Sequence, residues 1–221
     1  MPTASPPAGS IPTDDLMEKL TLHEYSPSGN CYKIRLTAAL LGVPIDRREY
    51  DIMKGETRTP DFLANVNANG RIPTLQIGDR FLPESNAACW WLASGSPLVP
   101  DDRFAQADML RWMFFEQYNH EPNVATLRFW KAFVGFDKLS DAQRGQIPAK
   151  QAAGEAALRL MDEHLAGRDY FVGQGLTLAD IGLYAYTHVA DEGGFDMDAF
   201  PNVQAWLGRM RAQPGYVAID D

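Results

Sequence analysis

The sequence predicts a small α/β unit followed by an all-helical unit. Up to residue 94, segments with strand or helix periodicity follow in the order strand, helix, strand, helix, strand, strand, helix. Residues 94–102 then contain Gly, Ser and two prolines, and beyond them apolar residues recur only at helical spacing. We therefore expect domains at 18–94 and 103–221, joined by a linker at 95–102.

The composition is that of a globular protein. Of the 221 residues, 45% are hydrophobic and 22% are charged, which allows a sizeable core. The net charge of -9 argues against nucleic-acid binding, and no apolar run is long enough to cross a membrane. Residues 1–17 are expected to be a flexible tail, because they lack the basic start and apolar block of a secretory signal. Only two cysteines, Cys31 and Cys89, occur, which favours a reducing cytoplasm over a disulfide framework.

The first unit opens with a strand, a turn and a helix. Apolar and polar residues alternate over 19–25, which predicts a strand. Residues 25–29 are all of types that turns favour. Helical spacing follows over 30–41, and Gly42 with Pro44 ends that helix.

The rest of the first unit is a second strand, a short helix, a hairpin and a last helix. The charges of residues 46–50 indicate an edge strand. After a polar loop at 54–59, Pro60 suits the first position of a short helix. The expected elements are a helix at 60–64, hairpin strands at 74–77 and 80–82, and a buried helix at 85–93.

The second unit is helical throughout. Residues 104–133 predict one long helix or two, and residues 140–165 another whose continuity Pro148 puts in doubt. Thr177 and Asp180 form a capping box that starts a further helix. A helix at 200–211 closes the set.

The turn from Ser28 to Cys31 carries the first chemical signal. A dithiol redox motif has cysteine at its first and fourth positions, so Ser28 excludes disulfide exchange within this motif. A hydroxyl at the positive end of a helix can stabilise an anion such as a thiolate by roughly 1.5 to 3 kcal/mol. The alternative is that Ser28 only caps the helix, and taken alone this motif favours that alternative.

Two stretches only a dozen residues apart carry the second signal. In 70–75, Pro73 follows the β-branched Ile72 and can leave a backbone amide and carbonyl facing outward. In 82–86, Glu84 and Ser85 open a helix, where free amide hydrogens bind anions. Together these stretches predict a surface that pairs with a peptide backbone and holds an amino-acid end, which indicates a small peptide ligand.

Taken together, these features resemble the cytosolic glutathione transferases over residues 18–215. The segment from Ser28 to Lys33 is similar in sequence to that of bacterial theta- and delta-related members, whose catalytic serine stands three residues before a cysteine, as Ser28 stands before Cys31. The resemblance implies a thioredoxin-like domain at 18–94 that binds glutathione and a helical-bundle domain at 103–221 that lines the electrophile site. It also implies a cytoplasmic homodimer with glutathione as co-substrate.

The resemblance assigns roles residue by residue. Ser28 would stabilise the glutathione thiolate with Asn30 as a candidate assistant; Tyr25 is a rival to Ser28, and Cys31 either packs or forms a mixed disulfide. Ile72, before a cis proline, would pair with the cysteinyl part, and Lys54 or Arg71 would meet the glycyl carboxylate. The implied glutathione-binding residues are Lys54, Arg71, Ile72, Pro73, Glu84 and Ser85, and those of the electrophile pocket are Trp112, Phe115, Tyr118 and Asn119.

The implied reaction is attack of the glutathione thiolate on an apolar or aromatic electrophile. Two alternatives stay open: a glutathione-dependent disulfide reductase or peroxidase, and a transferase-like module that binds partners without catalysis. Four histidines without metal-ligand spacing predict no metal site.

Overall fold

The computed structural model describes residues 18–221, so the expected tail at 1–17 lies outside the described residues. The chain divides into two units. The first runs to Val99 and includes Pro214–Asp221, and the second is Pro100–Gln213. We expected the helical domain to extend over 103–221, but residues 214–221 belong with the first unit. A hydrogen bond of 2.7 Å from the Tyr32 hydroxyl to the main-chain oxygen of Val217 shows where this last segment is anchored.

The first unit is built on a four-stranded sheet with the strand order β2-β1-β3-β4. β1 pairs in parallel with β2 and antiparallel with β3, and β3 and β4 form a hairpin. β2 is exposed along its whole length at the edge of the sheet, as its charges predict. The strands are β1 (Leu20–Glu24), β2 (Asp46–Glu49), β3 (Thr74–Ile77) and β4 (Arg80–Pro83).

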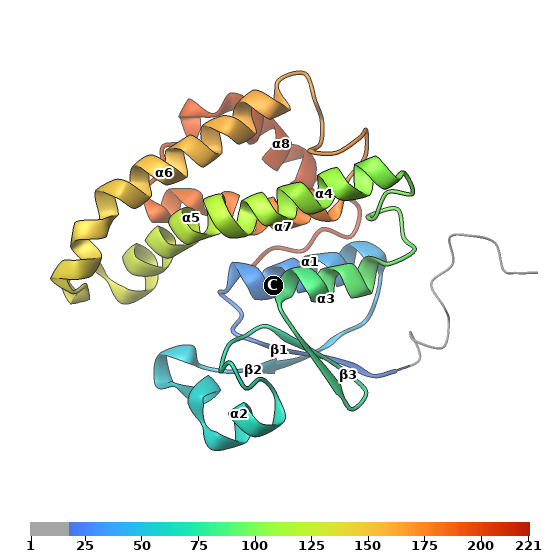
Figure 1. Ribbon diagram of the computed structural model, residues 1–221, viewed down its shortest axis with the longest axis vertical. Coiled ribbons are helices and arrows are strands. Elements are labelled where there is room, and N and C mark those ends of the chain that lie inside the picture. Colours follow the sequence, from blue (N-terminus) through green and yellow to red (C-terminus); the bar gives the residue numbers. More distant parts are fainter. Residues whose placement is uncertain (1–17) are drawn as a thin grey trace, which may run out of the picture. The chain divides into compact units, whose positions relative to one another are not determined.

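Three helices complete the first unit. α1 (Gly29–Leu41) and α3 (Ser85–Ala93) pack together on one face of the sheet, and α2 (Pro60–Asn65) lies on the opposite face (Figure 1). Leu22, Ile34 and Leu75 are fully buried in the core. The element order from β1 to α3 is the predicted one, and each predicted boundary lies within two residues of the observed one.

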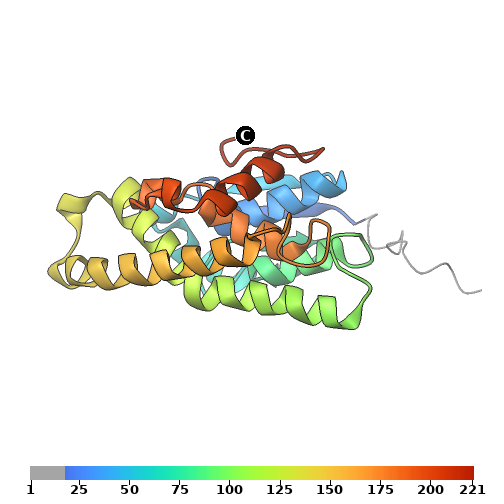
Figure 2. The ribbon, with the colours of Figure 1, turned by 90° about the horizontal axis from the view of Figure 1, so that it is seen from above.

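The second unit is helical. Residues 103–134 form one nearly unbroken helical run, in which the π-helical turns Glu116–His120 and Phe129–Val134 interrupt the α-helix. Figure 2 shows the helices of this unit from a second direction, with α6 beside α8. The α-helices are α4 (Arg103–Phe115), α5 (Glu121–Arg128), α6 (Asp141–Leu165), α7 (Leu178–Thr187) and α8 (Pro201–Arg211).

α6 runs without interruption through Pro148, so the doubt about its continuity was unfounded. A proline inside a helix removes one hydrogen bond of the ladder. The other turns of this helix of 25 residues hold it, and Ser140 and Gln143 form a capping box at its start. Pro148 itself is exposed, where a local distortion disturbs no core packing.

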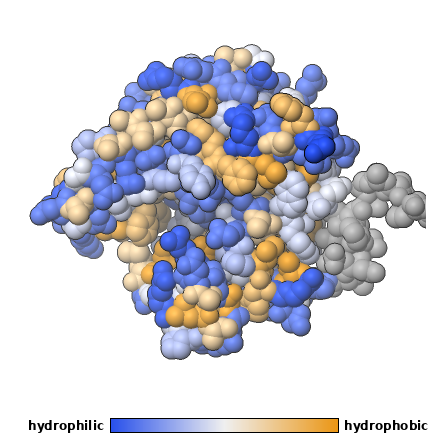
Figure 3. All heavy atoms as spheres, in the orientation of Figure 1, coloured by the Kyte–Doolittle hydropathy of each residue, from blue (hydrophilic) through white to orange (hydrophobic). Residues whose placement is uncertain are grey.

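The surface mixes polar and apolar residues. On the face shown in Figure 3, hydrophilic side chains are interspersed with hydrophobic ones. Of the helices within residues 18–221, none combines the length and the apolar character that a membrane span requires.

Candidate functional site

The register of the sheet brings the two sequence signals to one end of the first unit. Thr74 at the start of β3 pairs with His23 near the end of β1 and with Pro83 at the end of β4. Three segments therefore leave the sheet at the same edge: the turn that leads to Ser28, the Ile72–Pro73 peptide before β3, and Glu84 after β4.

Ser28 is the N-cap residue of α1. Its hydroxyl oxygen accepts a long hydrogen bond of 3.5 Å from the N–H of Cys31, and its own N–H donates to the carbonyl of Tyr25 at 2.9 Å. A serine hydroxyl that accepts one bond can still donate its own hydrogen. At the positive end of a helix, that O–H is suited to stabilise an anion.

Cys31 is fully buried inside α1 and is free of any disulfide. Burial raises the pKa of its thiol to about 12, against the lowering effect of a hydrogen bond from the N–H of Tyr25 at 3.4 Å. The thiol is therefore protonated at neutral pH and shielded from solvent. These properties fit a packing role and disfavour a mixed disulfide at this cysteine.

Glu84 and Ser85 form the start of α3. Glu84 has φ of 72°, and it is the one non-glycine residue with a positive φ among residues 18–221. Holding such a backbone costs about 1 to 3 kcal/mol and is typical of binding sites. Ser85 is 6% exposed, and its hydroxyl donates to the side-chain oxygen of Asn30 at 3.1 Å. This hydrogen bond joins the N-terminus of α3 to the N-terminus of α1, which follows Ser28.

The Ile72–Pro73 peptide bond is cis, as the resemblance implies. Pro73 is buried and Ile72 is half-buried at the entry to β3. Arg71 before them is exposed, and its carbonyl accepts a hydrogen bond of 2.9 Å from the Asn67 side chain. The chain bends at Ile72 and enters β3 at Thr74, at the same end of the sheet as Glu84.

Lys54 ends the 3-10 turn Ile52–Lys54 and pairs with Asp51 at 3.0 Å, with its side chain 75% exposed. The hydrogen bond to Asp51 raises the pKa of Lys54, so the ammonium is charged at neutral pH. Lys54 and Arg71 both present an exposed cation.

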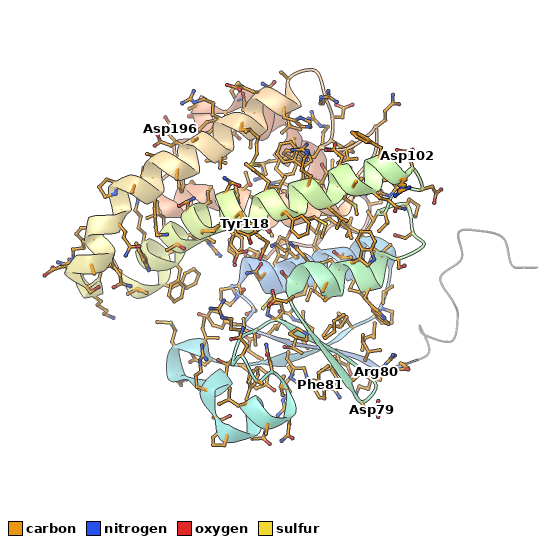
Figure 4. All side chains as sticks on the ribbon, viewed as in Figure 1. Asp79, Arg80, Phe81, Asp102, Tyr118 and Asp196 are labelled. Atoms are coloured by element: carbon orange, nitrogen blue, oxygen red, sulfur yellow. The ribbon has the colours of Figure 1, made fainter. Side chains whose placement is uncertain are left out.

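Of the expected electrophile-pocket residues in the helical unit, Trp112 is a core residue. It is 1% exposed, and its ring lies 4.6 Å from the ring of His164 and 4.7 Å from that of Phe171. Such a ring cannot line an open pocket. Phe115 is half-buried against Trp112, whereas Tyr118 is 81% exposed on the π-helical turn between α4 and α5, next to the exposed Asn119 (Figure 4).

Sequence reasoning missed a buried ionic cluster beside the Ser28 turn. Glu24 at the end of β1 is fully buried and pairs with Arg35 of α1 and Arg47 of β2. The available signal was an acidic residue directly after a buried strand and an arginine amid the apolar residues of a helix. Buried charges are rare unless paired, so these two residues could have been matched.

Within the described part of the chain, no group of three or more His, Cys, Asp or Glu side chains is arranged to hold a metal ion.

These observations define a thioredoxin-like α/β unit, with a candidate ligand site at one end of its sheet, followed by a helical unit. Two family models match: the glutathione S-transferase N-terminal domain at residues 27–94 and the glutathione S-transferase C-terminal domain at 123–214. The chain belongs to the glutathione S-transferase family of enzymes.

Individual relatives agree with this assignment. The glutathione S-transferase-like protein LUC7 of Fusarium sp. is 31% identical over 85% of this chain and 86% of its own length. A crystal structure of a possible glutathione S-transferase from Rhodopseudomonas palustris is 46% identical, covers 91% of this chain and 90% of its own, and superposes with a TM-score of 0.86. A glutathione S-transferase from Pseudomonas fluorescens is 41% identical, with coverage of 91% and 99% and a TM-score of 0.86.

Proposed function

We propose that this protein binds glutathione at the sheet edge and activates its thiol as a thiolate, with the Ser28 hydroxyl as the hydrogen-bond donor. The observation that carries the proposal is the position of Ser28 as N-cap of α1, beside the end of the sheet from which Ile72–Pro73 and Glu84 also extend. A hydroxyl donor and the helix field both favour the charged form of a bound thiol. This would be the serine-type arrangement that the resemblance to theta- and delta-related transferases implies.

The remaining site residues would hold the rest of the tripeptide. The backbone of Ile72 would pair with the cysteinyl part, since this residue stands directly before Pro73 and β3 at the end of the sheet where Ser28 and Glu84 also lie. Glu84 and Ser85 would take the γ-glutamyl amine and carboxylate, because a carboxylate attracts the amine and a helix N-terminus attracts an anion. Lys54 or Arg71 would pair with the glycyl carboxylate.

The reaction would be attack of the thiolate sulfur on an electrophilic carbon or sulfur of an apolar or aromatic molecule. A thiol with an ordinary pKa is only a few per cent ionised at neutral pH. Lowering its pKa by one to two units raises the ionised fraction to about a quarter to three quarters. Phe115, Tyr118 and Asn119 are our candidates for contact with this second substrate, and aromatic side chains suit an apolar ligand.

A homodimer and a cytoplasmic location remain predictions. The assembly is tested by the molar mass in solution, measured by light scattering after size-exclusion chromatography, which is expected at twice 24.6 kDa. A mass at the monomer value would remove the dimer from the proposal without affecting the glutathione site.

The activation is tested by an ultraviolet difference titration of protein-bound glutathione against pH. Thiolate absorbance that appears one to two units below the free thiol's pKa of about 8.5 would support binding and activation together. If no thiolate absorbance of the bound glutathione is seen at any pH where the free thiol is still protonated, the proposal is contradicted. Turnover of a mixed-disulfide substrate faster than a haloaromatic one would instead favour the reductase alternative.

A further inference from the structure

Arg35 of α1 lies where three segments of the first unit meet. Its guanidinium donates to the carbonyl of Ser26 at 2.6 Å and to that of Ile219 at 2.8 Å. A longer bond of 3.3 Å reaches the main-chain oxygen of Asp221, and its Nε lies 3.1 Å from Oε2 of Glu24. The side chains are nearly inaccessible, at 5% exposed for Arg35 and 0% for Glu24.

The Ser26 peptide groups are held from both sides, and Ser28 follows two residues later. The carbonyl of Ser26 accepts from Arg35, and its N–H donates to Oε1 of Glu49 at 2.8 Å. The N–H of Ser28 closes the turn on the carbonyl of Tyr25 at 2.9 Å. The main-chain position of Ser28 therefore depends on how Ser26 is anchored.

The last segment of the chain takes part in the same cluster. Tyr32 donates its hydroxyl to Val217 at 2.7 Å, and Arg47 donates to Asp221 at 2.7 Å while it also pairs with Glu24. Gly215 has φ of 82°, and a Cβ there would lie 2.9 Å from the carbonyl oxygen of Ala39, so the segment follows α1 closely. This docking supplies two of the acceptors that orient Arg35.

We propose that Arg35 is a positioning residue for Ser28, and that the segment 215–221 supports it by orienting the guanidinium. The inference rests on the proposed function of Ser28. A guanidinium presents a planar fork of donors that can serve several acceptors at once, whereas a lysine ammonium brings the charge without the fork. Hydrogen-bond donors stabilise an anion only within about 2.7–3.1 Å, so a small displacement of the turn weakens the bond to the thiolate.

The experiment compares Arg35→Lys with Arg128→Lys. Arg128 is also buried, with 7% of its side chain exposed, and it pairs with Glu192 at 2.7 Å inside the helical unit. The same substitution there removes a buried guanidinium without touching the Ser28 turn. For the full chain and both variants, the measured quantities are the pH midpoint of the bound thiolate band, kcat with a haloaromatic electrophile, the glutathione KM and the Tm.

We expect Arg35→Lys to raise the pH midpoint by about one unit. For a wild-type midpoint of about 6.5 to 7.5, this lowers the thiolate fraction at pH 7, and with it kcat, by about three- to eightfold. The glutathione KM should change by less than about threefold, since the turn contacts the thiol and not the peptide ends. Arg128→Lys should lower the Tm and keep the wild-type midpoint. An unchanged midpoint in folded Arg35→Lys overturns the inference. No thiolate band in the unaltered protein overturns the proposed function and this inference with it.

If Arg35→Lys does not fold, Glu49→Ala decides. Glu49 is exposed at the end of the edge strand β2, and among residues 18–221 its carboxylate bonds only to the N–H of Ser26. Asp46→Ala at the other end of β2 is the matched control, since Asp46 is exposed and pairs only with Lys19 among the ion pairs described, at 2.9 Å. A midpoint higher by about 0.3 to 0.5 units in Glu49→Ala than in Asp46→Ala supports the inference, as expected for loss of one hydrogen bond in the clamp. Equal midpoints overturn it.

Discussion

The Ser85 hydroxyl donates a hydrogen bond of 3.1 Å to the side-chain oxygen of Asn30, which joins the first turn of α3 to the first turn of α1. The two residues are 55 positions apart in the sequence. Ser85 directly follows Glu84, the proposed ligand of the γ-glutamyl amine. Asn30 lies two residues after Ser28, the proposed donor to the thiolate. The bond therefore links the part of the site that would hold the γ-glutamyl group to the part that would hold the thiol.

The first prediction is that Asn30 and Ser85 act together. Asn30→Ala and Ser85→Ala should each weaken glutathione binding, and the double variant should be less impaired than the sum by about 0.5 to 1.5 kcal/mol. Dissociation constants from calorimetry for the four proteins give this coupling. Asn86→Ala, in the same turn as Ser85, is the matched control and should show no coupling to Asn30→Ala. Strict additivity for the Asn30 and Ser85 pair would contradict a functional link.

The second prediction concerns the Ser28 hydroxyl. Ser28→Ala removes the donor and should lower kcat at pH 7 by up to roughly 8- to 25-fold, because the thiolate fraction falls to the few per cent of an ordinary thiol when its pKa returns from about 6.5 to 7.5 to about 8.5. The glutathione dissociation constant should change little, because the peptide ends bind elsewhere. Ser28→Thr keeps a hydroxyl and should retain most of the activity. Equal activity of the alanine and wild-type proteins would show that Ser28 only caps α1, and Asn30 and Tyr25 would be tested next.

The parts of the site that the sequence predicts depend on local signals. A serine before a helix, a proline before a strand and a Glu-Ser pair at a helix start each specify their own backbone geometry. Once the strand order is established, the pairing of Thr74 with His23 and Pro83 brings those three signals together. Trp112 was wrongly assigned to the electrophile pocket. Aromatic residues recur along much of residues 104–133, so periodicity alone could not distinguish the face of the helix that packs in the core. The two π-helical turns also shift the helical phase along this run.

The contacts of Arg35 with the last segment of the chain could not be predicted in the same way. Ile219 and Asp221 are separated from Arg35 by 184 and 186 positions in the sequence, and no local pattern relates them to it. The same holds for residues 214–221, which follow the last helix in sequence but pack on the first unit. Contacts of this range are determined by the folded arrangement of the whole unit, and because the acceptors are main-chain oxygens, the side chains of Ile219 and Asp221 give no signal for them.

The third prediction is that Asp180 contributes strongly to the stability of the helical unit. One carboxylate oxygen accepts from the N–H of Phe171 at 3.1 Å and from the indole of Trp206 at 3.0 Å, and the other accepts from the N–H and hydroxyl of Thr177. Asp180→Asn turns an NH₂ toward two of these donors and should lower the free energy of unfolding by about 2 to 4 kcal/mol.

The measurement for Asp180 is urea unfolding at pH 7.5. Burial raises the pKa of this carboxyl to about 6, so it is ionised at that pH. Asp169→Asn serves as control, because Asp169 is 74% exposed and lies 3.6 Å from Arg209; it should change stability by less than about 0.5 kcal/mol. If the two variants lose the same free energy of unfolding, the hydrogen bonds of Asp180 stabilise the unit no more than a surface carboxylate does.

The fourth prediction is a loss of stability in mild acid that depends on His188. Burial lowers the pKa of this imidazole to about 4, outweighing the hydrogen bond to the carbonyl of Tyr184 at 2.9 Å; Arg128 and Arg211 lower it further and Asp191 raises it. The unfolded chain binds a proton on this side chain near pH 6.5, and the folded chain does so only near pH 4. The stabilisation present above pH 6.5 is therefore lost as the pH falls from 6.5 to 4.

His188→Gln removes this titration and should flatten the dependence of unfolding free energy on pH. The wild-type protein should lose on the order of 3 kcal/mol more than the variant between pH 7 and pH 4. Urea unfolding at pH 8, where both states of the wild type are uncharged at this position, measures the loss of packing separately. His164 retains a lowered pKa through its burial, so part of the slope should persist in the variant. Parallel curves from pH 8 to pH 4 would mean that His188 becomes protonated equally in the folded and unfolded chains, and that its burial against Tyr184 does not exclude the proton.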